Sequence, residues 1–314
     1  MQTSKLVEIA KPYEAPTDFT FQPPLESVAQ ISTPTDFIIS GFLRASKTFS
    51  IYQAAYADLE VEGSYRPLQI ERVEGKPNES LFHRYLDVIR SNRAIRSVVI
   101  SDPYKQLAAT VCDELDNRAA LCDAVNLILR REGKLVGLNV DGEAFYRGLL
   151  RSHPVVSMKD AAILGCGGVS TAVAACLAPI LRTVKLVDID LGRAEGLSER
   201  LRSLNESLHI EVCRRPGAID FSGCDFMYNG TGLGKMSSDP ASVLKTPLET
   251  SDVLPRVGIA VDANYTPETT PFLAALRQQG LTLENGRSHM LAFVSIHIEK
   301  LIGQEVAIDS IERA

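Results

Sequence analysis

Residues Ala161 to Ala178 read AAILGCGGVSTAVAACLA and place three glycines directly after a short apolar run. Ala161 to Leu164 has the length and composition of a buried strand, and Thr171 to Ala178 has the small residues of a closely packed helix. Glycine permits backbone conformations and close approaches that other residues resist, so the glycines belong to the connection between these elements. The stretch therefore predicts a strand, a tight turn containing Gly165, Gly167 and Gly168, and a helix.

An acidic residue follows the glycine turn at a spacing that is typical of dinucleotide-binding folds. The next apolar run, at the start of VKLVDID, ends in Asp188, 20 residues after Gly168. In a dinucleotide-binding fold a carboxylate at this distance binds the adenosine ribose, while the N-terminus of the preceding helix faces the pyrophosphate. The sixth position of the G-x-G-x-x-G pattern is Ser170 rather than glycine. A glycine turn of this kind can also have a purely structural role, in which it lets a strand and a helix pack closely. Together, the turn, Val169 and Asp188 predict a dinucleotide site.

The residues around Asp188 indicate which dinucleotide binds. A 2′-phosphate on the ribose would be repelled by this carboxylate, whereas the free hydroxyls of NAD can donate hydrogen bonds to it. The next residue is Ile189 rather than an arginine, and Arg193 on the following helix is compatible with a simple surface position. We therefore expect NAD as the cofactor.

Composition narrows the class of protein. The 314 residues are 45% hydrophobic and 23% charged, enough to bury two domain cores. A formal net charge of −6 argues against nucleic acid or an anionic membrane as the main partner, and favours a small molecule. Six cysteines without a C-x-x-C pair and five scattered histidines indicate neither a disulfide framework nor a metal site, so we expect a reducing, cytoplasmic compartment.

Strand-like and helix-like segments alternate along the chain. DFIISGFL (Asp36 to Leu43) and SVVIS (Ser97 to Ser101) are strand-like, and amphipathic stretches such as LSERLRSLNE lie between such runs. This alternation is typical of βαβ units and a parallel sheet, hence of the α/β class. A break falls at Ser152, His153 and Pro154, just before the strand that leads into the glycine turn.

A series of motifs in chain order resembles the shikimate/quinate dehydrogenase family. These motifs are Ser46-Lys47-Thr48, DPYKQLA around Lys105, CDAVN at Asn126, GLNVDGEAFYRGL around Asp141, LGCGGVSTAVA, NGTGLGKM at Asn229, and DANYTPETTPFLAALRQQGLTLENG. The resemblance spans roughly residues 36 to 303. It implies a role in aromatic amino acid biosynthesis, a monomer or homodimer, and two α/β domains. Those domains are a substrate domain at 36–148 plus 286–314 and a Rossmann-type, doubly wound nicotinamide domain at 149–285, after an N-terminal extension at 1–35.

The resemblance also implies the catalytic pair. Lys105 in DPYK and Asp141 in GLNVD match the family's catalytic lysine and aspartate. Oxidation of a ring alcohol needs a hydride acceptor and a group that takes the hydroxyl proton, and a lysine paired with an aspartate suits the second task. Without the family, the sequence favours a solvated surface position for Lys105, and Asp141 could simply belong to a turn or cap a helix.

Further matches outline the substrate and cofactor contacts. Ser46 and Thr48 match two hydroxyl residues that hold a substrate carboxylate, although both could instead cap the helix that follows. Ser101, Asn126 and Tyr265 match polar residues around the substrate, and Asn229 and Thr231 would lie near the nicotinamide.

Three positions depart from the family pattern toward apolar residues. Val99 stands where the family has asparagine, Val140 where it has threonine, and Phe293 where a helix glutamine contacts substrate; a slip of one residue would put Val294 there instead. We therefore expect an NAD-dependent dehydrogenase acting on a shikimate- or quinate-like carbocyclic acid, or on a less hydroxylated analogue. A ligand sensor without catalysis and a methylene-tetrahydrofolate dehydrogenase are alternatives. The retained Lys105 and Asp141 disfavour the first, and the NYTPETTPFL segment fits the second poorly.

Overall fold

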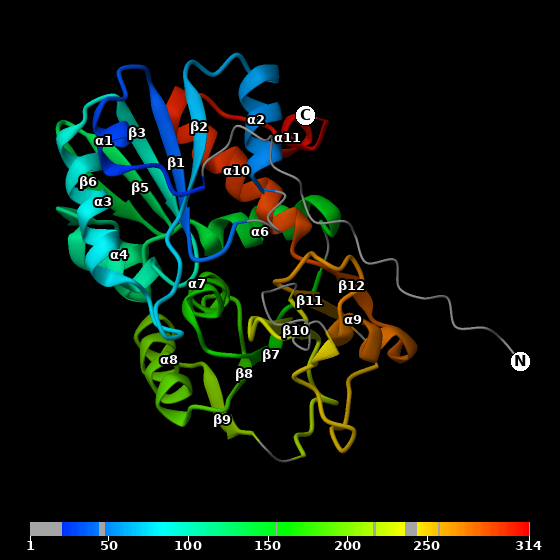
Figure 1. Ribbon diagram of the computed structural model, residues 1–314. Helices are drawn as coiled ribbons and strands as arrows, with labels where there is room; N and C mark the ends of the chain where they lie inside the picture. Colours follow the sequence, from blue (N-terminus) through cyan, green and yellow to red (C-terminus); the bar gives the residue numbers. More distant parts are fainter. Residues whose placement is uncertain are drawn as a thin grey trace, which may run out of the picture.

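The computed structural model describes residues 21–43, 48–154, 156–215, 218–235, 244–256 and 258–313. Ser46, predicted to bind substrate, lies outside the described residues. The chain forms two six-stranded sheets, each flanked by helices, in separate halves of the molecule (Figure 1). The predicted α/β class with a Rossmann-type second half is confirmed.

The first sheet has the strand order β2-β1-β3-β5-β6-β4. β2, β1 and β3 are parallel, β5 runs antiparallel to both of its neighbours, and β4 is parallel to β6. Its strands are β1 (Thr35–Ser40), β2 (Ser64–Gln69), β3 (Ile95–Ile100), β4 (Glu114–Leu115), β5 (Leu127–Arg131) and β6 (Lys134–Leu138). The helices within this half are α1 (Leu25–Ala29), α2 (Thr48–Asp58), α3 (Glu79–Ser91), α4 (Lys105–Val111) and α5 (Asn117–Cys122).

Apolar side chains cover both faces of this sheet. On one face, Phe37 and Ile39 of β1 pack in a cluster with Phe82 of α3 and Ala108 of α4. On the other face, Ile38 of β1 joins a cluster supplied by α2 and by the C-terminal helix α10 (Arg287–Ile302). Successive strand residues point to opposite faces, so the near-continuous apolar run predicted here is explained by helices on both sides.

The second sheet has the order β12-β11-β10-β7-β8-β9, and all its pairs are parallel. The chain starts in the middle at β7 and winds outward in both directions, which is the doubly wound arrangement. Its strands are β7 (Asp160–Leu164), β8 (Thr183–Asp188), β9 (His209–Arg214), β10 (Phe226–Asn229), β11 (Ile259–Asp262) and β12 (Thr282–Glu284). Around it lie α6 (Asp141–Ser152), α7 (Gly168–Leu177), α8 (Leu191–Leu204), α9 (Pro271–Leu276) and the 3₁₀ turn η2 (Arg277–Gln279).

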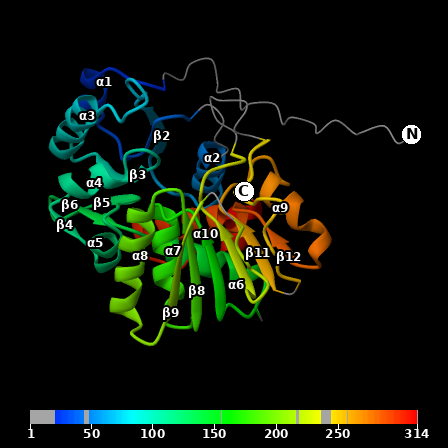
Figure 2. The ribbon, with the colours of Figure 1, turned by 90° about the horizontal axis from the view of Figure 1, so that it is seen from below.

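Two helices connect the halves by direct backbone contact. α6 leads from the first sheet into the second, and α10 returns the chain to the first before the short α11 (Ile308–Arg313) (Figures 1 and 2). A Cβ on Gly142 of α6 would lie 2.4 Å from the carbonyl oxygen of Ala172 in α7, and one on Gly148 would lie 2.5 Å from that of Ser288 in α10. Any larger residue at either glycine would push these helices apart, so the two glycines permit the close packing of α6 against α7 and α10.

The described part of the predicted N-terminal extension packs on the first half. Asn92 donates from its side-chain amide to the carbonyl oxygens of Val28, Ala29 and Ile31. The carbonyl oxygen of Phe21 accepts the N–H of Gln69, with an N–O distance of 2.5 Å, at the outer edge of β2. The segment that precedes β1 therefore covers part of an otherwise open sheet edge.

No helix in the described ranges is both long and apolar enough to cross a membrane. The six cysteines are free thiols.

Candidate active site

Most of the predicted site residues that the structure describes lie near the strand ends of the two sheets. Two close approaches between the halves of the molecule lie near these strand ends. The hydroxyl of Thr48 at the start of α2 lies 3.1 Å from that of Tyr265, which follows β11. A Cβ on Gly168 of the glycine turn would lie 3.6 Å from the Cβ of Ala124, just before β5. In α/β proteins, ligands bind outside the carboxyl ends of parallel strands, so the topology places candidate substrate and cofactor residues side by side.

Lys105 and Asp141, predicted as the catalytic pair, are in direct contact. Lys105 Nζ donates to Asp141 Oδ2 at 2.5 Å, and the two side chains are 20% and 6% exposed. Burial by itself raises the pKa of a carboxyl group, but the Lys105 ammonium and the His289 imidazole outweigh it and hold the pKa of Asp141 well below its ordinary value. Asp141 is therefore an anion at neutral pH and stabilises a positive charge on Lys105.

The fold around Lys105 fixes its place. Lys105 is the first residue of α4, after the buried Tyr104, whose hydroxyl donates to the carbonyl oxygen of Ile70 at 2.9 Å. The Tyr104 ring is stacked on Phe82, with centroids 5.0 Å apart. The carbonyl oxygen of Lys105 accepts the N–H of Val125 at 2.8 Å. The backbone at Lys105 is thus anchored from three sides, which leaves only its long side chain free to adjust.

Two buried asparagines position Asp141. Asn126 donates from its amide nitrogen to Asn139 Oδ1 at 3.1 Å, and its oxygen accepts the N–H of Val140 at 3.0 Å. Asn139 Oδ1 also accepts the N–H of Asp141 at 3.2 Å. A buried amide needs partners, and the ones found here lie in the loop that carries Asp141. Asn126, predicted as a substrate contact, thus also orders the start of α6. The role of Asn139 was missed, although it stands in the same GLNVD motif.

Sequence reasoning also missed His289. Its Nε2 lies 3.7 Å from Asp141 Oδ1, on the carboxylate oxygen that Lys105 does not contact. His289 precedes Phe293 by four residues, and residues four apart share one face of a helix. That spacing was the available signal, because the family pattern assigns Phe293 to the substrate side of this helix.

The predicted apolar positions belong to one cluster. Val99 of β3 and Val140, which precedes α6, are buried in it together with Phe49 of α2. The half-buried Phe293 packs against the same cluster, whereas Val294 is fully buried within it. Ser101, which follows β3, is half-buried, and its carbonyl oxygen accepts the N–H of Tyr104.

The glycine turn has the geometry that its sequence predicts. Gly165 has φ of +81°, and a Cβ there would lie 2.8 Å from the Cα of Thr231. Gly167 is the N-cap of α7, and a Cβ on it would meet nothing within 4 Å. Val169 is half-buried in the first turn of α7. The space beside Gly167, at the N-terminus of α7, is therefore open, which suits an anionic ligand.

Ser170 at the sixth position of the pattern packs closely against the next strand end. A Cβ on Gly230 would lie 2.0 Å from Ser170 Oγ. Ser170 is fully buried, and its hydroxyl has no hydrogen-bond partner within the described residues. The departure from glycine is therefore tolerated because residue 230, on the facing segment, is itself a glycine.

Asp188 lies at the carboxyl end of β8, beside the turn. Its Oδ2 accepts the N–H of Cys166 at 2.7 Å, and its Oδ1 accepts that of Asp190 at 2.9 Å. The side chain of Ile189 is 76% exposed, and Arg193 faces Asp190 at 3.5 Å. Each carboxylate oxygen has a second lone pair that these bonds leave available.

Asn229 and Thr231 form a second polar group at the end of β10. Asn229 Oδ1 accepts the Thr231 hydroxyl at 2.7 Å, and Asn229 Nδ2 donates to Asp262 Oδ2 at 3.0 Å. Asn229 and Asp262 are fully buried, whereas Thr231 is exposed. Burial raises the pKa of Asp262, which also accepts the hydroxyl of Thr270 at 2.6 Å. Asn229 therefore acts within the protein, and Thr231 is the member that a ligand can reach.

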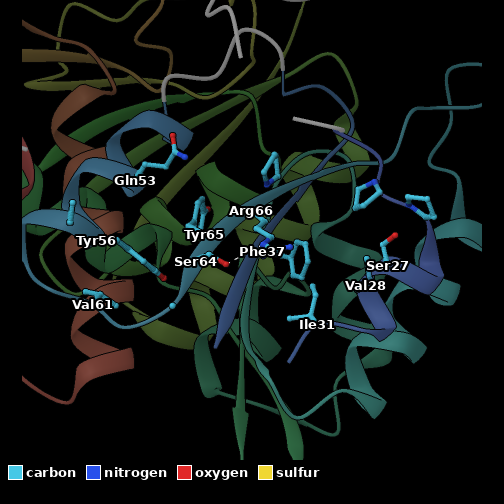
Figure 3. Close-up of a pocket in the computed structure, with 15 residues that line it drawn as sticks. Ser27, Val28, Ile31, Phe37, Gln53, Tyr56, Val61, Ser64, Tyr65 and Arg66 are labelled. Carbon is cyan, nitrogen blue, oxygen red and sulfur yellow. Dashed lines mark hydrogen bonds between the residues drawn. The ribbon is translucent and has the colours of Figure 1, made fainter. Parts of the chain in front are cut away.

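A cavity of about 710 Å³ lies apart from this site, at the outer edge of β2 (Figure 3). Its walls come from the N-terminal segment, from α2 and from β2, and include Tyr56 and Tyr65, but none of the predicted site residues. Pro67 in the adjoining edge strand has no N–H to offer an incoming strand. Among the described residues, no group of three or more His, Cys, Asp or Glu side chains is arranged to hold a metal ion.

Comparison with known proteins agrees with this geometry. Residues 38–128 match the family model described as the shikimate dehydrogenase substrate binding domain. The NADP(+) shikimate dehydrogenase of Rubrobacter xylanophilus is 31% identical over 248 residues, which cover 77% of this chain and 81% of that protein. The chain belongs to the shikimate dehydrogenase family. It is accordingly a nicotinamide-dependent oxidoreductase by family.

Solved structures of family members share the fold. Shikimate 5-dehydrogenase of Thermus thermophilus, in complex with NADP(H) and shikimate, superposes with a TM-score of 0.74 at 26% identity and covers 89% of this chain and 97% of its own. Quinate dehydrogenase of Corynebacterium glutamicum, in complex with NAD, gives a TM-score of 0.73 at 22% identity and covers 90% of this chain and 98% of its own. The second similarity is one of fold alone.

Proposed function

We propose that this family member is an NAD-dependent dehydrogenase that interconverts a ring hydroxyl and a ketone on a small carboxylated carbocycle. The observation that carries the proposal is the 2.5 Å contact between Lys105 and Asp141 at the level where the glycine turn meets the first sheet. In this proposal residues 36–148 and 286–314 bind the substrate, and residues 149–285 bind the cofactor.

The residues of the second half fit a dinucleotide. The open space over Gly167 and the uncapped start of α7 suit a pyrophosphate, and the carboxylate of Asp188 suits ribose hydroxyls. We assign the contacts of the dinucleotide to Gly165, Gly167, Gly168, Val169 and Asp188, and those of its nicotinamide end to Thr231 with Asn229 behind it. When bound, the nicotinamide supplies the hydride acceptor.

The proposed preference for NAD over NADP rests on this chain's own residues. Asp188 is 7% exposed and Ile189 projects into solvent, so the two residues at the carboxyl end of β8 offer a negative charge and an apolar side chain. A 2′-phosphate would face the Asp188 carboxylate without a positive charge from Arg193, which is paired with Asp190. The Rubrobacter xylanophilus relative is named for NADP(+), so this chain differs from it in the proposed cofactor.

Lys105 would handle the proton of the reacting hydroxyl. In the oxidising direction, the neutral amine at Nζ accepts the hydroxyl proton as the C–H bond breaks, and in the reducing direction the ammonium returns it to the oxygen. Asp141 is held as an anion and stabilises the ammonium form. The buried Asn126 and Asn139 keep the Asp141 backbone in place, so the pair needs little rearrangement during the reaction.

The substrate would be bound by hydroxyl groups on one side and apolar side chains on the other. We assign its carboxylate to Ser46 and Thr48, with Tyr265 beside Thr48, and a ring contact to Ser101. Val99 and Phe293 present no hydrogen-bonding groups, so a ring hydroxyl facing them would be desolvated without a partner. A less hydroxylated analogue of shikimate or quinate fits these residues better than shikimate itself.

A catalytically silent sensor is the second candidate, because Val99, Val140 and Phe293 remove polar contacts. The retained contact between Lys105 and Asp141 disfavours it, since ligand binding alone needs no proton-transfer pair.

The test is a screen of cofactor reduction. Purified protein is assayed with NAD and with NADP against a panel of carbocyclic hydroxy acids that includes shikimate, quinate and their deoxy analogues. We expect NAD reduction with at least one compound, and a loss of kcat of roughly 10²- to 10⁴-fold in Lys105→Ala, with NAD binding unchanged. Lys134→Ala, at an exposed lysine paired with Glu114, is the matched control and should behave as the unmodified protein. NAD binding without turnover of any compound would favour the sensor.

A further inference from the structure

Asp141 is flanked by two basic side chains, one at each carboxylate oxygen. Lys105 of α4 contacts Oδ2 at 2.5 Å, and His289 of α10 lies 3.7 Å from Oδ1 through its Nε2. The histidine side chain is 14% exposed. The proposed mechanism uses only the first of these two contacts.

The backbone of His289 is fixed relative to Asp141. Asp141, Phe145 and Gly148 occupy positions i, i+4 and i+7 of α6, hence one face of that helix. A Cβ on Gly148 would lie 2.9 Å from the backbone nitrogen of His289. The two helices therefore touch backbone to backbone at the peptide bond that joins Ser288 to His289, and α10 cannot slide along α6 without a clash.

The ring of His289 is also fixed. It meets the ring of Phe145 edge to face, with centroids 6.2 Å apart and planes at 83°. Phe145 is itself 1% exposed and contacts Tyr228 in the same manner, at 5.4 Å and 82°. Such edge contacts hold the plane of a ring as well as its position. The imidazole is thus held with Nε2 toward the carboxylate.

A carboxylate on a short side chain turns about its last torsion, which is broad and nearly two-fold. One donor at Oδ2 leaves that torsion poorly determined, whereas donors at both oxygens define the plane of the group. The 3.7 Å separation is longer than the roughly 2.7–3.2 Å of a typical hydrogen bond, and a small adjustment of either side chain closes it.

We propose that His289 is a positioning residue that acts through Asp141. It carries its proton on Nε2 in the neutral form, directs this N–H to Asp141 Oδ1, and so keeps Oδ2 turned toward Lys105. The kinetic consequence rests on the proposed function, but the contact itself does not.

Nitrogen NMR tests the contact without any assay of activity. With ¹⁵N-labelled imidazole at a pH where His289 is neutral, we expect the Nε2–H tautomer in the unmodified protein and a loss of that preference in Asp141→Leu, which has no acceptor. An Nδ1–H tautomer in the unmodified protein would overturn the proposal even if the enzyme turned out to have another substrate.

Kinetics test the consequence with three substitutions. Gln places an amide nitrogen near the position of Nε2, Asn places one too far back, and Leu has no donor. We expect His289→Gln to keep kcat nearly unchanged and His289→Asn and His289→Leu to lose roughly 10- to 100-fold in kcat, with KM for the cofactor unaltered. Thermal unfolding of each variant monitors folding.

Equal kcat values for Gln and Leu variants would overturn the positioning role, because a merely structural role does not distinguish a donor from an apolar side chain. If the unmodified protein turns over no compound of the panel, the proposed function fails, and the tautomer measurement still decides whether His289 binds Asp141.

Discussion

The carboxylate of Asp188 accepts the backbone N–H of Cys166 at 2.7 Å, so the acidic end of β8 is tied to the glycine turn that follows β7. These residues are 22 apart in sequence: Asp188 ends β8, and Cys166 follows β7, the parallel strand next to it. The bond holds the carboxylate beside the place where the start of α7 opens to solvent. This hydrogen bond joins the two parts of the dinucleotide-binding pattern, the glycine turn and the acidic residue.

Removing the charge of Asp188 should change cofactor preference. Asp188→Ala should raise KM for NAD about ten- to hundred-fold, since a hydrogen bond to a charged group contributes roughly 1.5–3 kcal/mol. It should also raise kcat/KM for NADP relative to NAD, because the repulsion of a 2′-phosphate is lost. Asp188→Asn removes the negative charge but keeps an oxygen that can accept the N–H of Cys166. It therefore distinguishes the effect of the charge from that of losing this hydrogen bond. A higher kcat/KM for NADP than for NAD in the unmodified protein would contradict the assignment.

Restoring amides at the two apolar positions should favour a more hydroxylated substrate. An unpaired, desolvated hydroxyl costs roughly 1–3 kcal/mol, and Val99→Asn with Phe293→Gln offers such a hydroxyl partners. We expect kcat/KM for shikimate to rise relative to the best substrate of the unmodified protein. Thermal unfolding checks for the cavity left where the Phe293 ring packs. Efficient turnover of shikimate that either substitution lowers would show that other residues already bind this hydroxyl.

The contact between Gly230 and Ser170 should appear as coupling in a double-mutant cycle. Gly230→Ala should lower the free energy of unfolding by about 1–3 kcal/mol, because its Cβ would overlap Ser170 Oγ. Ser170→Ala removes a buried hydroxyl without a partner among the described residues and should be close to neutral. In the Ser170→Ala background, Gly230→Ala should cost less, although the Tyr228 ring remains 3.1 Å from the new Cβ. Chemical denaturation of the four proteins measures the coupling, and strictly additive effects would refute the overlap.

His297 should make the stability of the first half depend on pH. It is fully buried, with its ring nitrogens 2.7 Å from the Ser97 hydroxyl and 2.8 Å from that of Tyr52. Burial lowers the pKa of His297 to about 4, despite the nearby negative charge of Asp36. The folded pKa lies below the unfolded one, so the contribution is complete above about pH 6.5 and is lost as the pH falls toward 4, when the unfolded chain takes up the proton.

The loss over this interval should amount to about 3 kcal/mol in the free energy of unfolding. His297→Gln, which can still hydrogen-bond but does not titrate, should flatten this part of the curve. Urea unfolding of both proteins from about pH 7.5 to about pH 4 measures the difference. Parallel curves for the two proteins would contradict a buried, neutral histidine.

Local sequence determined the elements and most of the candidate site. The glycine turn, the strand that ends in Asp188 and the apolar β1 could be read directly, because backbone conformation and strand burial depend on residues close in sequence. The resemblance to the family supplied Lys105 and Asp141, and the structure brings them into contact. It also predicted Thr48 and Tyr265 as contacts of one substrate, and their hydroxyls lie 3.1 Å apart although the residues are 217 apart in the chain.

Only the tertiary structure decided how polar groups are shared. The sequence predicts Asn126 as a substrate contact, but its side-chain oxygen and one N–H are hydrogen-bonded to the loop that carries Asp141. His289 reads as one of five scattered histidines, and its place at Asp141 depends on the crossing of α6 and α10 at Gly148. A hydrogen bond is set by distances of a few tenths of an ångström between atoms far apart in the chain. Sequence pattern fixes which groups must be satisfied, and only the packing of whole helices and sheets determines which partners satisfy them.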